Sequence, residues 1–223
     1  MPRRIIGGAF ISLDGVMQAP GGPEEDDQGG FEHGGWMAAL FEEAIGNQVD
    51  TLFSPPFDLL LGRRTYDIFA AHWPYTSIEE DEGIAALFAK NEKFVLTRSE
   101  EPLEWQGSHR LADIDAVAAL KETDGPDLVI QGSSTLYPQL LQRGLIDRLV
   151  LTIGPVVLGS GKRLFGEGTP AGSWKMIEQR LSPNGTVMAT YEPAGPIRTV
   201  SFGMPDPSPR EMERRAKLAA GTW

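Results

Sequence analysis

The amino-acid sequence predicts an α/β fold, a three-layer α/β/α sandwich on a mixed, mostly parallel sheet that ends in an antiparallel hairpin. Short apolar segments alternate with amphipathic helical segments up to about residue 144, which is typical of a parallel sheet with helices on both faces. Strand-like segments then follow one another, and the last two flank the turn signal Pro183-Asn184-Gly185. With 223 residues, 41% of them apolar, the chain can bury one core.

The first predicted unit is a strand over residues 5–13, where Gly7 and Gly8 indicate that another element packs close to the backbone. Residues 18–35 are rich in glycine, proline and acids, and we expect them to form a lid or substrate loop. A helix is predicted over residues 36–49, because apolar side chains recur there at spacings of three and four.

Three further strand-and-helix units follow. A strand over residues 58–61 leads through Gly62 into a helix, a second strand covers residues 93–97, and Asp113 caps a helix. The strand over residues 128–131 leads into a helix over residues 136–142. The predicted strands of the closing part are residues 147–153, 175–181 and 186–192.

A domain boundary is predicted near residue 193, with the main domain over residues 1–193 and a Pro/Gly linker and helical tail over residues 194–223. Ser208-Pro209-Arg210-Glu211 is a capping-box signal that opens a helix to about Ala220. We expect this tail to dock on its own subunit or on a neighbour, and it favours a homodimer.

Charge and composition exclude several classes of partner and site. A net charge of −11 disfavours nucleic acid, and the apolar block near Met1 is too short for a signal peptide or a membrane span, so we expect a cytoplasmic protein without a membrane partner. The chain has no cysteine, and its three histidines show no ligand spacing, so no metal site is predicted.

Three predicted strands end in turns that carry glycine, hydroxyl or arginine side chains: Gly62-Arg63-Arg64-Thr65, Thr97-Arg98-Ser99 and Gly132-Ser133-Ser134-Thr135. Backbone N–H groups at such turns, before a helix, favour an anion, and open α/β sheets bind ligands at the carboxyl ends of their strands. Together the turns indicate a site for a dinucleotide with an extra phosphate. Ordinary capped turns and surface salt bridges remain the alternative explanation.

These motifs, with Ser12-Leu13-Asp14-Gly15, resemble dihydrofolate reductase. They resemble still more the reductase domain at the C-terminal end of bifunctional riboflavin-biosynthesis deaminase-reductases, which residues 154–165 also resemble, and the resemblance covers about residues 4–192. The zinc deaminase half of those enzymes needs cysteines, so this chain lacks it. The sequence also lacks the acid before an aromatic pair that marks the pterin pocket of dihydrofolate reductase, so the small cyclic substrate stays open between pterin-like and pyrimidine-like rings.

The resemblance implies NADPH as the cofactor. It places the adenosine phosphates on Gly62, Arg63, Arg64 and Thr65, the ribose 2′-phosphate near Thr97, Arg98 and Ser99, and the pyrophosphate on the run from Gly132 to Leu136. The first strand and its turn at Asp14 and Gly15 would lie near the nicotinamide.

Hydride transfer needs one acid near the pocket to supply or relay a proton. Asp14 is the first candidate, although a turn residue bonded to its own backbone explains it equally well. Glu42, Asp67 and His33 are further candidates. Phe31 and Trp36 are expected to stack on a flat substrate ring, and Asp67 to line it; packing of Trp36 onto the sheet is the alternative. A nucleotide-binding or sensing protein without catalysis is the second functional hypothesis.

Overall fold

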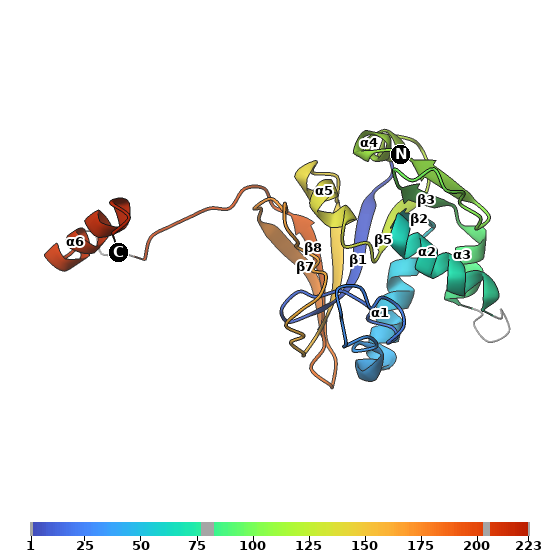
Figure 1. The fold of residues 1–223 in the computed structure, drawn as a ribbon, viewed down its shortest axis with the longest axis horizontal. Coiled ribbons are helices and arrows are strands. Elements are labelled where there is room, and N and C mark those ends of the chain that lie inside the picture. Colours follow the sequence, from blue (N-terminus) through green and yellow to red (C-terminus); the bar gives the residue numbers. More distant parts are fainter. Residues whose placement is uncertain (1, 77–82, 203–205, 223) are drawn as a thin grey trace.

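The structure, a computed structural model, describes residues 2–76, 83–202 and 206–222. A twisted eight-stranded sheet runs through its centre in the order β4-β3-β2-β5-β1-β6-β8-β7 (Figure 1). Strands β1 to β6 are parallel to one another, whereas β8 runs antiparallel to β6 and β7. The strands are β1 (Ile5–Ser12), β2 (Phe57–Gly62), β3 (Lys93–Leu96), β4 (Ser108–Leu111), β5 (Asp127–Gln131), β6 (Arg148–Gly154), β7 (Trp174–Leu181) and β8 (Val187–Pro193).

Helices cover both faces of the sheet, as two separate apolar clusters show. The helices are α1 (Glu43–Phe53), α2 (Arg63–His72), α3 (Ile84–Lys90), α4 (Ile114–Lys121), α5 (Leu136–Gln142) and α6 (Pro209–Ala219), with short 3₁₀ turns at Ala38–Leu40 and Trp73–Tyr75. Val117 of α4 and Tyr137 of α5 pack with one face, and Phe53 of α1, Tyr66 of α2 and Phe88 of α3 pack with the other. The predicted α/β/α sandwich with a closing antiparallel hairpin is therefore confirmed.

The chain changes direction across the sheet at β1 and β5. From β1 it passes to β2 and β3 on one side, and after β4 it returns to β5 beside β1 before continuing to β6. The helices that make the two sets of crossovers lie on opposite faces, so the carboxyl ends of β1, β2 and β5 border a crevice. This topology positions the candidate site.

A third apolar cluster anchors the segment between β1 and α1. It contains Val16, Ala19, Phe31, Trp36, Met37, Ile45 and Met188. The indole Nε1 of Trp36 donates a hydrogen bond of 3.0 Å to the carbonyl oxygen of Gln18. The segment over residues 18–35 is thus a packed loop whose rear side belongs to the core.

The prediction of a helix over residues 36–49 was wrong about where the helix starts, because α1 begins later, at Glu43. Gly35 adopts a φ of 83°, Trp36 and Met37 turn into the core, and the regular helix begins only after Glu42, whose backbone is extended. Burial of two large side chains therefore outweighs the helical spacing of this segment. The sequence interpretation also missed α3 and the short edge strand β4, whose residues are largely exposed and carry no apolar alternation.

The tail extends away from the sheet after β8, and α6 lies apart from the rest of the molecule (Figure 1). Ser208 caps α6 by accepting a hydrogen bond from the Glu211 N–H, as the capping-box signal predicts. The tail as a separate unit, its docking and a homodimer stay predictions. Within the described ranges, no helix combines the length and apolar character needed to span a membrane.

Gly7 lies where β1 meets α5, and it gives the first testable prediction. A Cβ at this position would lie 2.7 Å from Cε1 of Tyr137 and 2.9 Å from Cδ2 of Leu149. Tyr137 is fully buried and donates a hydrogen bond to the carbonyl oxygen of Gly8, so it has no free space. Gly7→Ala should lower the free energy of unfolding by about 1–3 kcal/mol through overpacking, measured by urea denaturation.

The matched control is Gly172→Ala, at an exposed position where an added Cβ meets nothing closer than 4.0 Å. Its stability should stay within about 0.5 kcal/mol of the wild type. Equal effects of the two substitutions would contradict the close approach of α5 to β1.

Candidate functional site

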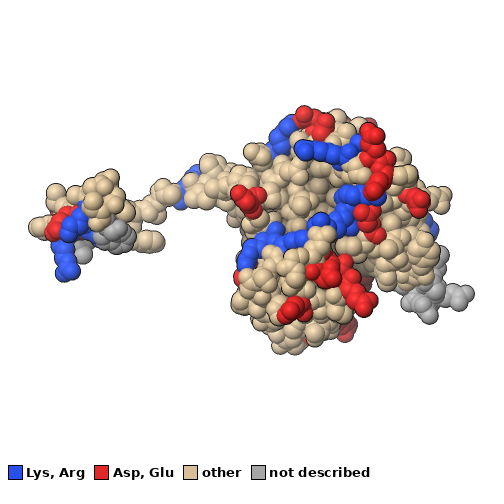
Figure 2. All heavy atoms as spheres, in the orientation of Figure 1, with Lys and Arg blue, Asp and Glu red and all other residues tan. Residues whose placement is uncertain are grey.

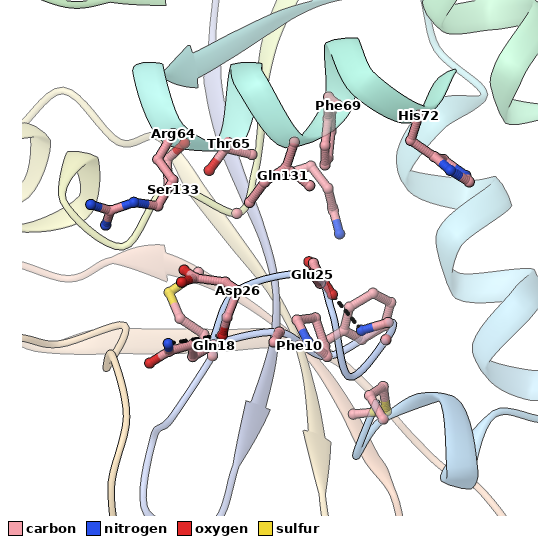
Figure 3. Close-up of a pocket in the computed structure, with 18 of the residues that line it drawn as sticks. Phe10, Gln18, Glu25, Asp26, Arg64, Thr65, Phe69, His72, Gln131 and Ser133 are labelled. Carbon is pink, nitrogen blue, oxygen red and sulfur yellow. Dashed lines mark hydrogen bonds between the residues drawn. The ribbon is translucent and has the colours of Figure 1, made fainter. Parts of the chain in front are cut away.

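A cleft of about 1280 Å³ opens at the carboxyl ends of β1, β2 and β5. Helix α2 forms one wall, and the segment from Met17 to Asp26 forms the wall that faces it (Figure 3). Ligand pockets usually measure about 300–1,000 Å³. The cleft is therefore large enough for more than one small molecule.

Two of the predicted strand-end turns interlock at one end of this cleft. The backbone N–H of Gly62, at the end of β2, donates a hydrogen bond of 2.8 Å to Oγ of Ser133, which follows β5. Gly132 and Ser133 have φ angles of 84° and 66°, and a Cβ on Gly132 would lie 3.1 Å from the Thr65 side chain. The left-handed backbone at Gly132 therefore lets the second turn lie directly against the first.

The backbone N–H groups at this end are available for a ligand. Gly62 is the N-cap of the ten-residue helix α2 and has no side chain with which to cap it. Helix α5 has only seven residues, and its N-cap Thr135 makes no side-chain cap hydrogen bond. Consecutive left-handed residues and an uncapped helix start both form concave, electropositive sites for anions.

The two arginines of the first turn point in different directions. Arg64 lines the cleft, whereas Arg63 turns outward and pairs with Asp67 at 2.8 Å and with the Glu101 carboxylate at 3.1 Å. Asp67 also lines the cleft but is engaged by this ion pair. Arg64 is therefore the guanidinium that the structure offers to a ligand inside the cleft.

The third turn lies outside the cleft. Thr97 is buried, its hydroxyl accepts a hydrogen bond from the Ser99 N–H, and Arg98 is exposed. Since Arg63 contacts Glu101 just after this turn, the first and third turns are neighbours at the rim. Leu136 is buried in the core below Ser133, so only its backbone is near the second turn.

Asp14 also lies outside the cleft, where it fastens a second loop. Its carboxylate accepts hydrogen bonds from the Ser12 hydroxyl at 2.6 Å and from the N–H groups of Leu158 and Gly159 at 3.1 and 3.0 Å. The Ser12 hydroxyl and these N–H groups lower the pKa of Asp14 to about 2. These contacts favour the turn role, and the structure does not bring Asp14, or Gly15 beside it, into the cleft.

The other proposed catalytic and substrate residues are also placed elsewhere. Phe31 and Trp36 are buried behind the loop, His33 is exposed with its ring edge-on to Phe31 at 5.7 Å, and none of the three lines the cleft. Glu42 precedes α1, and its Oε1 is buried without a hydrogen-bond partner among the described residues. The packing role of Trp36 is thus the one that the structure shows.

Sequence reasoning missed the residues that shape the loop wall. The Gln18 side chain donates to the carbonyl oxygens of Asp26 and Gln28 at 3.0 and 2.9 Å and accepts from the Lys162 N–H at 3.0 Å. Nζ of Lys162 in turn pairs with the Asp26 carboxylate. The loop is therefore closed on itself and tied to the segment after β6.

Glu25 projects from this loop into the cleft, between the loop and α2 (Figure 3). Its Oε2 accepts a hydrogen bond of 2.7 Å from the Gly21 N–H. Burial raises the pKa of the Glu25 carboxyl, although hydrogen bonds from the Gly21 and Gly22 backbone oppose the shift. The sequence signals the loop through its glycine, proline and acid content, but nothing in it distinguishes Glu25 from its acidic neighbours.

Basic side chains are interspersed with acidic ones around this face. Figure 2 shows a band of Lys and Arg atoms across the middle of the side drawn, with Asp and Glu atoms beside it. Within the ranges that the structure describes, no three His, Asp or Glu side chains gather where they could hold a metal ion.

Comparison with known proteins identifies relatives across most of the chain. The model of the RibD C-terminal domain family matches residues 3–188. The uncharacterized protein YyaP of Bacillus subtilis is 28% identical over 196 residues, which cover 85% of this chain and 94% of the relative.

Solved structures share the fold at low sequence identity. A candidate riboflavin biosynthesis protein from Shewanella sp. PV-4 superposes with a TM-score of 0.62 at 23% identity, over 86% of this chain and 99% of that chain. Dihydrofolate reductase from Enterococcus faecalis, complexed with NADP(H), gives a TM-score of 0.55 at 14% identity, over 86% and 96%. The Thermotoga maritima deaminase and 5-amino-6-(5-phosphoribosylamino)uracil reductase gives 0.56 at 13% identity, over 86% of this chain and 57% of that longer chain.

Asp14 gives a prediction about the pH dependence of stability. Its pKa of about 2 lies below the ordinary value of 3.8, so the ionised carboxylate stabilises the folded state above the ordinary value. This contribution is lost as the pH falls through about 2. Asp14→Asn should therefore lower stability at neutral pH, and the difference from the wild type should shrink in acid, as urea denaturation across this range will measure.

The control is Asp50→Asn, an exposed position on α1. Its stability should follow the wild type at every pH. A difference between Asp14→Asn and the wild type that persists unchanged in acid would show that the charge of Asp14 does not hold the loop.

Proposed function

The chain belongs to the RibD C-terminal domain family, and from this premise we propose that it is a reductase that carries hydride from NADPH to a small cyclic substrate of pterin or pyrimidine type. The interlocked turns at the ends of β2 and β5 carry the proposal. They line one end of a cleft, and apolar side chains line the other end. A site that binds a dinucleotide and a second, flat ligand side by side needs both kinds of surface.

The residues of the interlocked turns fit the phosphates of such a cofactor. The left-handed backbone at Gly132 and Ser133 and the uncapped start of α2 supply N–H donors, and Arg64 and Thr65 add side-chain donors at the same place. The Enterococcus faecalis dihydrofolate reductase, which has the same fold, is complexed with NADP(H). NADPH in this cleft would supply the hydride.

The protein's own contribution is to orient two rings and to exclude water. Beyond the turns, the cleft is lined by apolar side chains of β1, α1, α2 and α3 and of the short turns that precede α1 and follow α2: Phe10, Met37, Phe41, Val49, Phe53, Ile68, Phe69, Trp73, Ile84 and Phe88. An apolar wall of this kind packs against flat rings and keeps the transfer path dry.

We place the 2′-phosphate of NADPH at the rim, between Arg63 and the turn Thr97-Arg98-Ser99. Arg63 and this turn lie on adjacent segments, and Arg63 now pairs with Asp67 and Glu101. An incoming phosphate would replace the Glu101 carboxylate as the partner of Arg63, because a bidentate guanidinium contact to phosphate is stronger than an exposed ion pair.

A nucleotide-binding or sensing role without catalysis is the second candidate. It is favoured by the positions of Asp14, His33 and Glu42, since none of these proposed proton donors lines the cleft. A reductase and a non-catalytic sensor would both bind the cofactor in the same site, but only the reductase would oxidise NADPH. Oxidation of NADPH in a screen of pterins and pyrimidines would rule out the second candidate.

Isothermal titration with NADPH and NADH tests the cofactor site directly. We expect the full chain to bind NADPH at sub-millimolar concentration, and failure to bind either nucleotide would overturn the proposed function. Arg64→Ala should weaken the binding of both nucleotides by about tenfold or more, since a hydrogen bond to a charged group contributes roughly 1.5–3 kcal/mol. Arg198→Ala, in the exposed tail, is the control and should leave both dissociation constants unchanged.

A double substitution tests the position of the 2′-phosphate. Arg63→Ala with Arg98→Ala should remove the preference for NADPH over NADH, because only NADPH carries that phosphate. The binding of NADH should change little. If the ratio of the two dissociation constants stays as in the wild type, the 2′-phosphate binds elsewhere.

A further inference from the structure

The half of the cleft away from the interlocked turns determines what can bind beside the cofactor, and the inference drawn from it rests on the proposed function. This half is mostly apolar, with aromatic side chains from β1, α1 and α2. The polar groups that enter it come chiefly from the loop wall. Among them, Glu25 is the carboxyl that Figure 3 shows in the space facing Phe69.

Cationic side chains are scarce along this cleft. Among the described residues that line it, Arg64 is the one arginine and Lys162 the one lysine, whereas Glu24, Glu25, Asp26 and Asp67 are acidic. Arg64 lies at the end with Ser133 (Figure 3), and Lys162 is already paired with Asp26. His72 lies at the far end, with its ring edge-on to Trp73 at 4.9 Å.

A phosphate monoester carries close to two negative charges at neutral pH. In the apolar half it would meet Glu25 and Glu24 without an unpaired lysine or arginine among the described lining residues to neutralise it. Like charges in a partly dry cleft repel strongly, and a charge buried without a partner is costly. The apolar half, where the substrate would bind, therefore disfavours a phosphorylated ligand. The half with the interlocked turns, where the cofactor would bind, favours one.

Glu25 supplies the complementary preference. Its carboxyl is partly buried and held in place by the Gly21 N–H, so it presents a fixed acceptor to the cleft. Burial raises its pKa, which means that a partner able to donate hydrogen bonds or positive charge is favoured there. Ring N–H groups and exocyclic amino groups of a heterocycle are such partners.

We propose that the substrate is a flat heterocycle without a phosphate group, and that Glu25 binds a ring N–H or amino edge of it. The aromatic side chains that line this half, among them Phe10 and Phe69, cover the faces of the ring. The family relative from Thermotoga maritima is a reductase of 5-amino-6-(5-phosphoribosylamino)uracil, so this chain differs from that relative in the substrate class it takes.

The experiment uses the full chain saturated with NADP⁺ and measures the binding of a matched pair by isothermal titration. The pair is 5-amino-6-(5-phosphoribosylamino)uracil and the same compound after removal of its phosphate. The dephosphorylated compound should bind more tightly, by about tenfold or more, because like-charge contacts are costly in a specific site. Equal or tighter binding of the phosphorylated compound would overturn the proposal.

A second arm tests Glu25 with diaminopteridine, a flat ring with an amino edge that can take up a proton. Glu25→Gln should weaken its binding by about tenfold or more, the effect of a hydrogen bond to a charged group. It should also abolish the change in ultraviolet absorption that accompanies protonation of the bound ring. Glu32→Gln, an exposed position of the same loop that does not line the cleft, is the matched control and should bind like the wild type.

Wild-type protein that binds NADP⁺ but not diaminopteridine would overturn this inference and leave the cofactor proposal intact. Equal weakening by the two glutamine substitutions would also overturn it, because the effect would then come from net charge. Failure to bind NADP⁺ at all would instead be a failure of the proposed function.

Discussion

The hydrogen bond from the Gly62 N–H to Oγ of Ser133 is the contact on which the cleft depends. It joins the ends of β2 and β5, and it requires both the left-handed backbone at Gly132 and the space that Gly132 leaves beside Thr65. The start of α2 is thereby fixed relative to the second turn. Because α2 also forms a wall of the apolar half, this one contact at the strand ends sets the position of both halves of the site.

The charge of the cleft follows from where the protein has paired its ions. Arg63 is paired at the rim and Lys162 at the loop, which leaves Arg64 beside the backbone donors of the two turns. Although the chain has a net charge of −11, the backbone donors of the two turns and the Arg64 guanidinium form a local site that favours anions. The acids Glu24, Glu25 and Asp26 line the loop wall, so the two halves of one cleft differ in charge.

Features encoded locally could be predicted from the sequence. Most of the strands and helices, apart from α3 and β4, the hairpin, the cap at Ser208 and the turns at Gly62 and Gly132 each depend on a few consecutive residues. Features that depend on distant contacts could not. The start of α1 is set by burial of Trp36, the role of Asp14 by loop residues near Leu158, and the position of Glu25 by a network that runs through Gln18 to Lys162.

The loop between β1 and α1 divides its residues between two tasks. Phe31 and Trp36 hold its rear against the core, and the Gln18 side chain closes the loop on itself, while the stretch from Gly21 to Asp26 faces the cleft. Substitutions in the front stretch therefore change ligand choice without disturbing the packed residues that fold the loop. This separation allows the front stretch to vary in sequence while the packed rear keeps the loop in one conformation.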